Sequence, residues 1–155
     1  MIRLTILGEP ASKANSREIV TIGGRPSSIK SKKAREYERA ALPQIPPAAR
    51  QRIEGPVCVT LRIFYASERP DLDESVVLDV MQDRWHKREC NPFDGKPEPR
   101  ALLQAGVYRN DRQVREKHVY HAIDRKNPRV EIEVKPIAAQ QQMLDEVRGD
   151  VWAEF

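Results

Sequence analysis

Cysteine, histidine and aromatic residues are scarce in this chain of 155 residues. The two cysteines, Cys58 and Cys90, are too few for a disulfide scaffold, and with three histidines they lack the paired spacing of a structural zinc site. No apolar run approaches the ~20 residues that a membrane helix needs, and the N-terminus lacks the basic and then apolar pattern of a signal peptide. We therefore expect a soluble, cytoplasmic protein with no membrane segment and no sulfur-bound metal.

Several catalytic motifs are also missing. The sequence has no phosphate-cradling Gly-x-x-x-x-Gly-Lys, no Gly-x-Ser-x-Gly elbow and no dinucleotide fingerprint, and we expect no small-molecule cofactor. The histidines form no recognisable triad, because His118 and His121 are three residues apart in a predicted strand and point to opposite faces. For His121 and Cys90 we favour a structural role over a functional one.

Positive charge is concentrated in the first half of the chain. Lys plus Arg total 27 against 23 Asp plus Glu, but residues 1–70 hold 13 cations and 6 anions, net +7, while residues 71–155 hold 14 and 17, net −3. From Ser12 to Arg39 there are eight cations and three anions, a density typical of a surface that binds phosphate backbones. The alternative is an ordinary solvated face. The candidate DNA-binding residues are Lys13, Arg17, Arg25, Lys30, Lys32, Lys33 and Arg35.

Hydrophobic periodicity predicts the elements of the first half. Apolar residues alternate over residues 2–7 and, most clearly, over residues 57–65, which predicts two strands, the second in the centre of a sheet. Between them, Gly23-Gly24 predicts the turn of a basic hairpin. Ser31 is the expected N-cap of a helix that ends before Pro43.

The second half is predicted to contain a helix, a long loop and two further strands. A helix is predicted where apolar residues recur at helical spacing, at Val76, Val77, Val80, Met81 and Trp85. Prolines and Asp94-Gly95 predict a loop, and two later strands are expected to pair with each other. These segments are the loop 86–100, the strands 114–123 and 130–134 joined through 124–128, and a helix from residue 137.

Together these elements predict an α+β fold, with a mixed β-sheet and packed helices in a single domain. The domain spans residues 1–136 with the loop insertion at 86–100, and residues 137–155 form a C-terminal helical extension.

Three carboxylates are the best candidates for chemistry. Asp71 and Asp73 are two residues apart where an extended segment meets a helix, so both side chains can face one side. Asp111 precedes the next strand. If the three converge, an oxygen-only cage would select a hard divalent ion such as Mg²⁺, which can stabilise a transferring phosphate. The alternative is that Asp71 and Asp73 simply begin a helix, where negative charge is favourable.

Four short motifs occur in an order that is informative as a set. They are Gly8-Glu9-Pro10-Ala11-Ser12-Lys13, then Gly23-Gly24, then Lys30-Ser31-Lys32-Lys33-Ala34-Arg35-Glu36-Tyr37-Glu38, and finally Asp71-Leu72-Asp73 with Asn110-Asp111-Arg112-Gln113-Val114. Over about residues 2–135 this order resembles the RusA-type Holliday junction resolvases, with their Pro-x-Ser-Lys opening, basic hairpin, Lys-x-x-Tyr helix and paired acidic motif.

The resemblance implies a bacterial or phage-encoded homodimer that binds branched DNA. It implies a Mg²⁺-dependent endonuclease, with Mn²⁺ as a substitute, that resolves four-way junctions by paired symmetric nicks. Carried over by residue, Asp71, Asp73 and Asp111 would be the catalytic metal ligands. Trp85, Tyr65 or Phe93 could enter the branch point, although packing is the commoner role of such side chains.

The chain departs from the family in two places. Family members continue the acidic pair with Asn and place a Lys four residues after the second Asp, where this chain has Glu74 and Val77. Lys117 or an Arg of the hairpin could supply the missing cation, and Glu74 is a further candidate for the site. The 38 positions from Asp73 to Asp111 are also about twice the usual family spacing. Two alternatives therefore stay open: a non-catalytic module that binds branched DNA, and a nuclease directed at flaps or forks.

Overall fold

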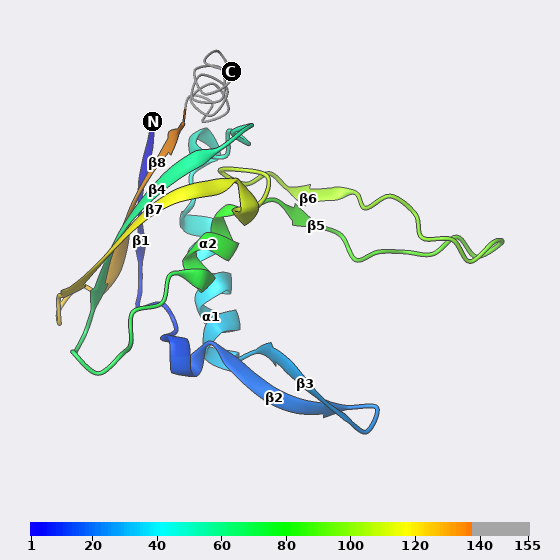
Figure 1. The fold of residues 1–155 in the computed structure, drawn as a ribbon, viewed down its shortest axis with the longest axis horizontal. Helices are drawn as coiled ribbons and strands as arrows, with labels where there is room; N and C mark the ends of the chain where they lie inside the picture. The colour runs from blue at the N-terminus through cyan, green and yellow to red at the C-terminus, as the bar shows by residue number, and fades with distance from the viewer. Residues whose placement is uncertain (138–155) are drawn as a thin grey trace, which may run out of the picture.

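Four strands form one mixed sheet in the computed structural model, which describes residues 1–137 (Figure 1). The strand order is β1-β8-β4-β7; β8 is antiparallel to both of its neighbours and β7 is parallel to β4. The predicted strands are confirmed. Their bounds are β1 (Ile2–Leu7), β4 (Val57–Tyr65), β7 (Val114–Ile123) and β8 (Arg129–Pro136).

The predicted pairing of the last two strands is wrong. After β7 the chain crosses the end of β4, where the backbone N–H of Asp124 donates to the carbonyl of Tyr65 (2.9 Å), and β8 then lies between β1 and β4. This position buries Val130, Ile132 and Val134 between two neighbouring strands. Alternation in the sequence shows which face of a strand is buried, but it does not show which strands are its neighbours.

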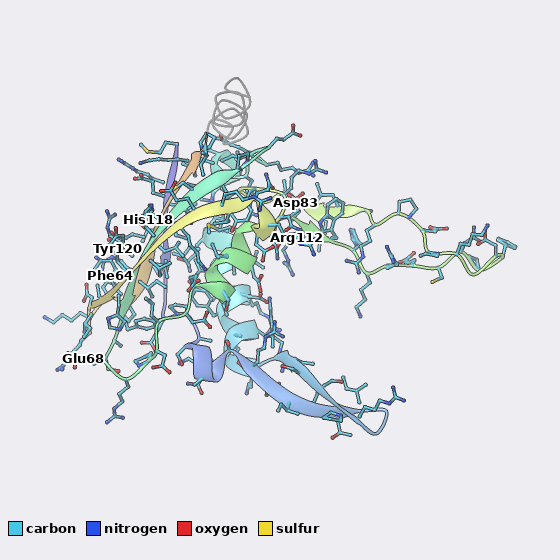
Figure 2. All side chains as sticks on the ribbon, in the orientation of Figure 1. Phe64, Glu68, Asp83, Arg112, His118 and Tyr120 are labelled. Carbon is cyan, nitrogen blue, oxygen red and sulfur yellow. The ribbon has the colours of Figure 1, made fainter. Side chains whose placement is uncertain are left out.

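One face of the sheet is covered by two helices, α1 (Lys32–Ala41) and α2 (Ser75–Met81), and together with the sheet they form a small α+β domain (Figure 1). On β4 the residues at alternate positions from Val57 to Tyr65 are fully buried beneath them. The opposite face is open, and Figure 2 shows Phe64, His118 and Tyr120 on it.

Helix α1 follows the prediction closely. The hydroxyl of Ser31 caps the helix by accepting from the backbone N–H of Ala34 (3.1 Å). Ala34, Tyr37 and Ala41 are buried, and the other faces carry the charges. Three-residue 3₁₀ turns follow at η2 (Leu42–Gln44) and η3 (Pro47–Ala49).

Helix α2 is shorter than the spacing predicts, because it ends at Met81 and leaves Trp85 outside the apolar stripe. Trp85 is 41% exposed and belongs to β5 (Arg84–Trp85). The chain becomes extended at Gln82 (ψ 167°), and Asp83, the next residue, is buried in an ion pair that turns the backbone away from the helix. The helical spacing of Trp85 therefore does not reflect a place in the helix.

Two arms project from the same side of the molecule (Figure 1). The first is the predicted hairpin of β2 (Arg17–Ile22) and β3 (Arg25–Lys30), in which Gly23 and Gly24 both have positive φ (57° and 78°), as a type I′ turn requires. The second, which we call the ribbon arm, runs from β5 to β6 (Leu102–Gln104).

The ribbon arm contains the segment predicted as a loop. Cross-strand backbone hydrogen bonds continue beyond β5 and β6, from His86 to Ala101 (3.0 Å) and from Glu98 to Glu89 (2.9 Å). The arm then reverses direction between Asn91 and Lys96, where the backbone N–H of Asn91 donates to the carbonyl of Lys96 (2.9 Å). Prolines keep it from forming a regular ladder, yet the insertion is a paired ribbon rather than an irregular loop.

An ion pair between Arg52 and the buried carboxylate of Asp83 anchors the ribbon arm to the core, and Figure 2 labels Asp83 at the base of the arm. The carboxylate of Asp83, whose side chain is 0% exposed, accepts from Nε (3.0 Å) and Nη2 (2.8 Å) of Arg52 and from the backbone N–H of Gly106 (2.9 Å). Gly106 lies so close to the backbone of residues 81–83 that a Cβ would come within 2.4 Å of the Gln82 carbonyl carbon. Arg52 itself adopts a left-handed φ of 48°, which is unusual for a residue other than glycine.

The remaining predictions concern the C-terminal extension and the membrane. The predicted helix of residues 137–155 lies, apart from Ile137, outside the described residues. None of the helices in residues 1–137 has both the length and the apolar composition needed to span a membrane.

We predict that Asp83→Ala lowers the free energy of unfolding by about 2–3 kcal/mol, because it leaves the Arg52 guanidinium and the Gly106 N–H without their buried acceptor. Urea denaturation followed by circular dichroism measures the change. The control is Asp94→Ala, which removes an exposed carboxylate of the ribbon arm that, within residues 1–137, contacts Lys96 alone, and it should change stability by less than about 0.5 kcal/mol. Equal stability of the two variants would contradict the anchoring role of Asp83.

Candidate functional site

Charged side chains of both signs line a cavity of about 250 Å³ beside the start of α2, which we call the acidic cavity. It is formed where the foot of the β2–β3 hairpin, helix α2, the 3₁₀ turn η4 (Asp111–Gln113) and strand β7 meet. Its charged lining residues are Glu74, Asp79 and Asp111, with Arg17, Lys30 and Lys117.

Of the three predicted metal ligands, Asp111 is the one that lines this cavity. A capping box orders its turn: the Asn110 carboxamide accepts from the N–H of Arg112 (2.8 Å), and the Gln113 side chain accepts from the N–H of Asn110 (3.0 Å). The Asp111 carboxylate is left exposed to solvent by this arrangement and is free to meet a ligand.

Asp71 and Asp73 are held by a shared partner, the hydroxyl of Tyr65. The hydroxyl donates to the backbone carbonyl of Asp71 (3.3 Å) and accepts from the N–H of Asp73 (3.3 Å). Asp73 is buried, and its carboxylate accepts from the N–H of Ser75 (2.9 Å) at the start of α2. The alternative interpretation, that this pair begins a helix, therefore describes what the Asp73 side chain does in this structure.

The expected convergence of Asp71, Asp73 and Asp111 is not found. Among residues 1–137, no group of three that contains them has ligand atoms within 4.8 Å of one another. Burial turns Asp73 toward the helix start, and Asp71 does not line the cavity that Asp111 lines. The structure instead brings Asp111 into one cavity with Glu74 and Asp79.

Asp79 was not predicted as a site residue, and its neighbour Gln82 ties it to Asp111. The Gln82 carboxamide donates to Asp79 Oδ1 (3.3 Å) and accepts from the backbone N–H of Asp111 (3.4 Å). A signal for Asp79 was present in the sequence, since it is a polar residue beside the buried positions Val76, Val77 and Val80 of α2. Nothing in the sequence showed that the hairpin would lie against that side of the helix.

Lys30, the last residue of the hairpin, bridges two helices. Its ammonium pairs with Asp79 of α2 (2.8 Å) and with Glu38 of α1. Burial lowers the pKa of Lys30, but hydrogen bonds to Asp79 and Glu38 outweigh this effect and raise the pKa above its ordinary value of 10.5. Lys30 therefore holds a fixed positive charge at the edge of the acidic cavity.

Lys117 and Glu74, both proposed above as additional site residues, form an ion pair across the cavity. Lys117 comes from the edge strand β7 and its side chain is half exposed. Three cations in this cavity could replace the one missing from the acidic motif: Lys117 and the hairpin residue Arg17, both of which the sequence offered, and Lys30, which it did not offer for this role.

The other predicted DNA-binding cations lie along the hairpin, its foot and α1. Lys13 is in the 3₁₀ turn η1 (Lys13–Asn15). Surface ion pairs engage several of them: Lys32 with Glu36 (3.8 Å), Lys33 with Glu9 (3.6 Å) and Arg35 with Glu18 (3.0 Å). In the described part of the chain, exposed Arg17 and Arg25 have no such partner. Exposed pairs contribute little to stability, so a phosphate can displace them at low cost.

The predicted branch-point residues differ sharply in exposure. Tyr65 is fully buried and cannot enter DNA, which corrects that expectation. Phe93, near the end of the ribbon arm, is 97% exposed and Trp85 is partly exposed. His121 packs its ring against Tyr65 (centroids 5.1 Å apart), and Cys90 is an exposed residue of the arm.

Cys58, Glu116 and His118 form the one cluster among residues 1–137 whose ligand atoms lie within 4.8 Å of one another. It arises because Cys58 and Glu116 are partners in the β4–β7 register, which could not be predicted from the sequence. Burial, followed by the neighbouring Glu116, raises the pKa of the Cys58 thiol, and His118 is held by Glu116 (2.7 Å). Its sulfur and nitrogen donors suit a softer ion than Mg²⁺, so this cluster is not a candidate for the Mg²⁺ site.

We predict that Lys30→Gln lowers the free energy of unfolding by about 1 kcal/mol at about pH 7, because Asp79 and Glu38 would lose their shared cation. The loss should shrink at about pH 4, where carboxylates begin to be protonated. In the native protein, the contribution of Lys30 to the free energy of unfolding should persist up to about pH 10.5, the ordinary pKa of a lysine. It should then disappear as the pH rises through the raised pKa that Lys30 has in the folded protein.

Urea denaturation at several pH values measures these effects. Lys87→Gln, which removes an exposed cation from the ribbon arm, is the matched control and should leave stability unchanged at each pH. A Lys30→Gln effect that is the same at about pH 7 and about pH 4 would show that lost packing, not lost charge, is responsible.

Comparisons with known proteins do not extend these observations. No model of a known protein family matches the chain, and no curated protein matches it either. The resemblance to RusA-type resolvases therefore depends on the motifs in the sequence, and a functional assignment has to be argued from the residues that the fold brings together.

Proposed function

We propose that the protein is a metal-dependent endonuclease that acts on branched DNA, with four-way junctions as its substrate. The observation that supports this proposal best is the acidic cavity, in which Glu74, Asp79 and Asp111 lie at the foot of a cationic hairpin. A phosphodiester needs cations to hold its backbone and carboxylates to hold the ion that activates water. Both are present within one cavity.

The donor set of the cavity suits Mg²⁺ or Mn²⁺ better than zinc, because its candidate ligands are carboxylate oxygens. Glu74, Asp79 and Asp111 would hold the ion; their ligand atoms do not all lie within 4.8 Å of one another in this structure, so the side chains would have to move together on binding. When bound, a divalent ion supplies charge stabilisation at the phosphate and lowers the pKa of water. In this structure Glu74 and Asp79 are paired with Lys117 and Lys30, so ion binding would compete with these lysines.

The chain's own cations have a separate task in this proposal. Lys30 and Arg17 line the cavity from the hairpin side, where they would bind the phosphate and orient it toward the carboxylates. Phosphate contacts position DNA without specifying bases, so we expect modest sequence preference. A homodimer, as the RusA resemblance implies, would place two such cavities for paired nicks with the two-fold symmetry of a junction.

A second candidate function is a module that binds branched DNA without cutting it. Two observations favour it: Asp71, Asp73 and Asp111 do not converge, and the family's Lys is replaced by Val77, which is buried in the core. A nuclease directed at flaps or forks is the third candidate, and the same assay separates all three.

We predict that the purified protein nicks a labelled four-way junction symmetrically in Mg²⁺, and that Asp111→Asn slows cleavage at least about a hundredfold while binding is kept. Asp73→Asn should leave the cleavage rate near that of the native protein, because Asp73 does not line the cavity and its carboxamide can still accept from the Ser75 N–H at the helix start. Gel analysis of the products and anisotropy of the labelled junction measure cleavage and binding separately.

Glu68→Gln is the matched control, since it neutralises an exposed carboxylate outside the cavity. Its cleavage rate should equal that of the native protein. Binding without nicking at any concentration of divalent ion would establish the binding module instead, and a preference for flaps over junctions would establish the third candidate.

A further prediction concerns the cationic surface. Lys32→Ala combined with Lys33→Ala should weaken junction binding, because both lysines are exposed and form only long surface pairs. The slope of log affinity against log salt concentration should become shallower by about 0.9 for each phosphate that the variant no longer neutralises. Anisotropy titrations across a salt series measure the slope. An unchanged slope would remove this end of α1 from the DNA-binding surface.

A further inference from the structure

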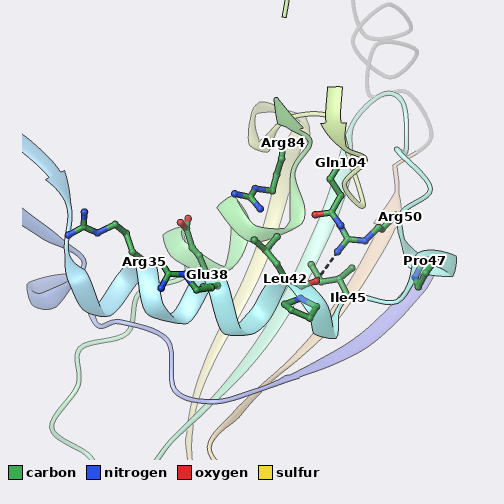
Figure 3. A pocket seen from close by; sticks show the side chains of 10 residues that line it. Arg35, Glu38, Leu42, Ile45, Pro47, Arg50, Arg84 and Gln104 are labelled. Atoms are coloured by element: carbon green, nitrogen blue, oxygen red, sulfur yellow. Dashed lines mark hydrogen bonds between the residues drawn. The ribbon is translucent and has the colours of Figure 1, made fainter. Parts of the chain in front are cut away.

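A second cavity, of about 780 Å³, is lined in part by Glu38, which pairs with Lys30 of the acidic cavity. It is bounded by α1, the segment that follows α1 and the start of the ribbon arm (Figure 3). Four arginines line it against a single carboxylate, that of Glu38. We call it the arginine groove, and its cationic residues are Arg35, Arg39, Arg50 and Arg84.

Most of the positive charge in the groove is uncompensated. Arg50 donates to the backbone carbonyl of Leu42 (2.8 Å; Figure 3) and to that of Ala105 (2.9 Å), which fix its guanidinium without neutralising it. Burial and the nearby Arg84 lower the pKa of Arg50, as expected when like charges face each other. In the described part of the chain, Arg39 and Arg84 form no ion pair. The one carboxylate, Glu38, is already engaged by Lys30.

Apolar side chains lie between these cations. Leu42 is partly exposed, and the rings of Pro43 and Pro47 are exposed at the groove. Guanidinium groups bind phosphates with two hydrogen bonds and stack on planar rings, and apolar surface contacts the faces of unstacked bases. A duplex keeps those faces inside its stack, whereas a single strand presents them.

We propose that the arginine groove binds a single-stranded segment of nucleic acid, with its phosphodiesters on Arg39 and Arg84 and its bases against the proline-lined wall. This inference rests on the proposed function in one respect only, namely that the bound strand runs toward the acidic cavity. Lys30 pairs with Glu38 of the groove and with Asp79 of the acidic cavity, so the two cavities adjoin. A strand bound in the groove therefore leads toward the carboxylates, so an unpaired strand, such as that of a flap or fork, has a path on the protein.

The test is a binding titration with a short fluorescein-labelled oligothymidylate in EDTA, where no cleavage can occur. Arg39→Gln combined with Arg84→Gln should weaken binding about tenfold and reduce the log–log salt slope by about 1.4, since each single-strand phosphate contact contributes about 0.7. Arg125→Gln combined with Lys126→Gln removes two exposed cations from the turn between β7 and β8, and it should leave binding unchanged.

Equal binding by the native protein and the Arg39/Arg84 variant would overturn the proposal. So would an equal loss in the Arg125/Lys126 variant, which would show a dependence on net charge alone. A duplex of the same sequence bound as tightly as the single strand, or polyglutamate competing as well as the oligothymidylate, would also overturn it. Because Asp111→Asn leaves the groove intact, it should bind the oligothymidylate normally, which separates failure of this inference from failure of the nuclease proposal.

Discussion

The ion pair between Arg52 and the buried carboxylate of Asp83 determines where the core ends and the ribbon arm begins. It draws the chain away from α2 at Gln82, and it holds Gly106 against the same stretch of backbone on the return. Both cavities border this anchor: Arg84 of the groove follows Asp83 directly, and Gln82 before it positions Asp79 and Asp111. One buried carboxylate and its partners thus fix the relative placement of the arm and of two surfaces rich in charge.

Much of the fold was predictable because its signals are local. Strand alternation over residues 57–65, the Gly23-Gly24 turn and the Ser31 cap depend on neighbouring residues, and each was confirmed. Strand neighbours were not predictable, since the insertion of β8 between β1 and β4 depends on contacts between distant segments. The end of α2 was missed for the same reason: Asp83 needs Arg52, which lies 31 positions earlier.

The candidate site was predictable only in part. The acidic motif and Asp111 were candidates because carboxylates are metal ligands. Glu74 and Lys117 were candidates because the chain departs from the family pattern near the acidic motif, and both line the cavity. Asp79 and the bridging role of Lys30 depend on how the hairpin packs on α2, which no local pattern encodes. The arginine groove was even less predictable from the sequence, because its cations come from three separate segments of the chain.

The residues of β7, one of the two edge strands of the sheet, affect whether another chain can add to it as a strand. Strand β7 leaves one side of its backbone unpaired, a template on which another chain could add as a strand. Four consecutive polar residues, Arg115 to His118, occupy the first half of that edge, and all of them are exposed. Desolvating such a row is costly, which opposes the addition of another strand at this edge of the sheet.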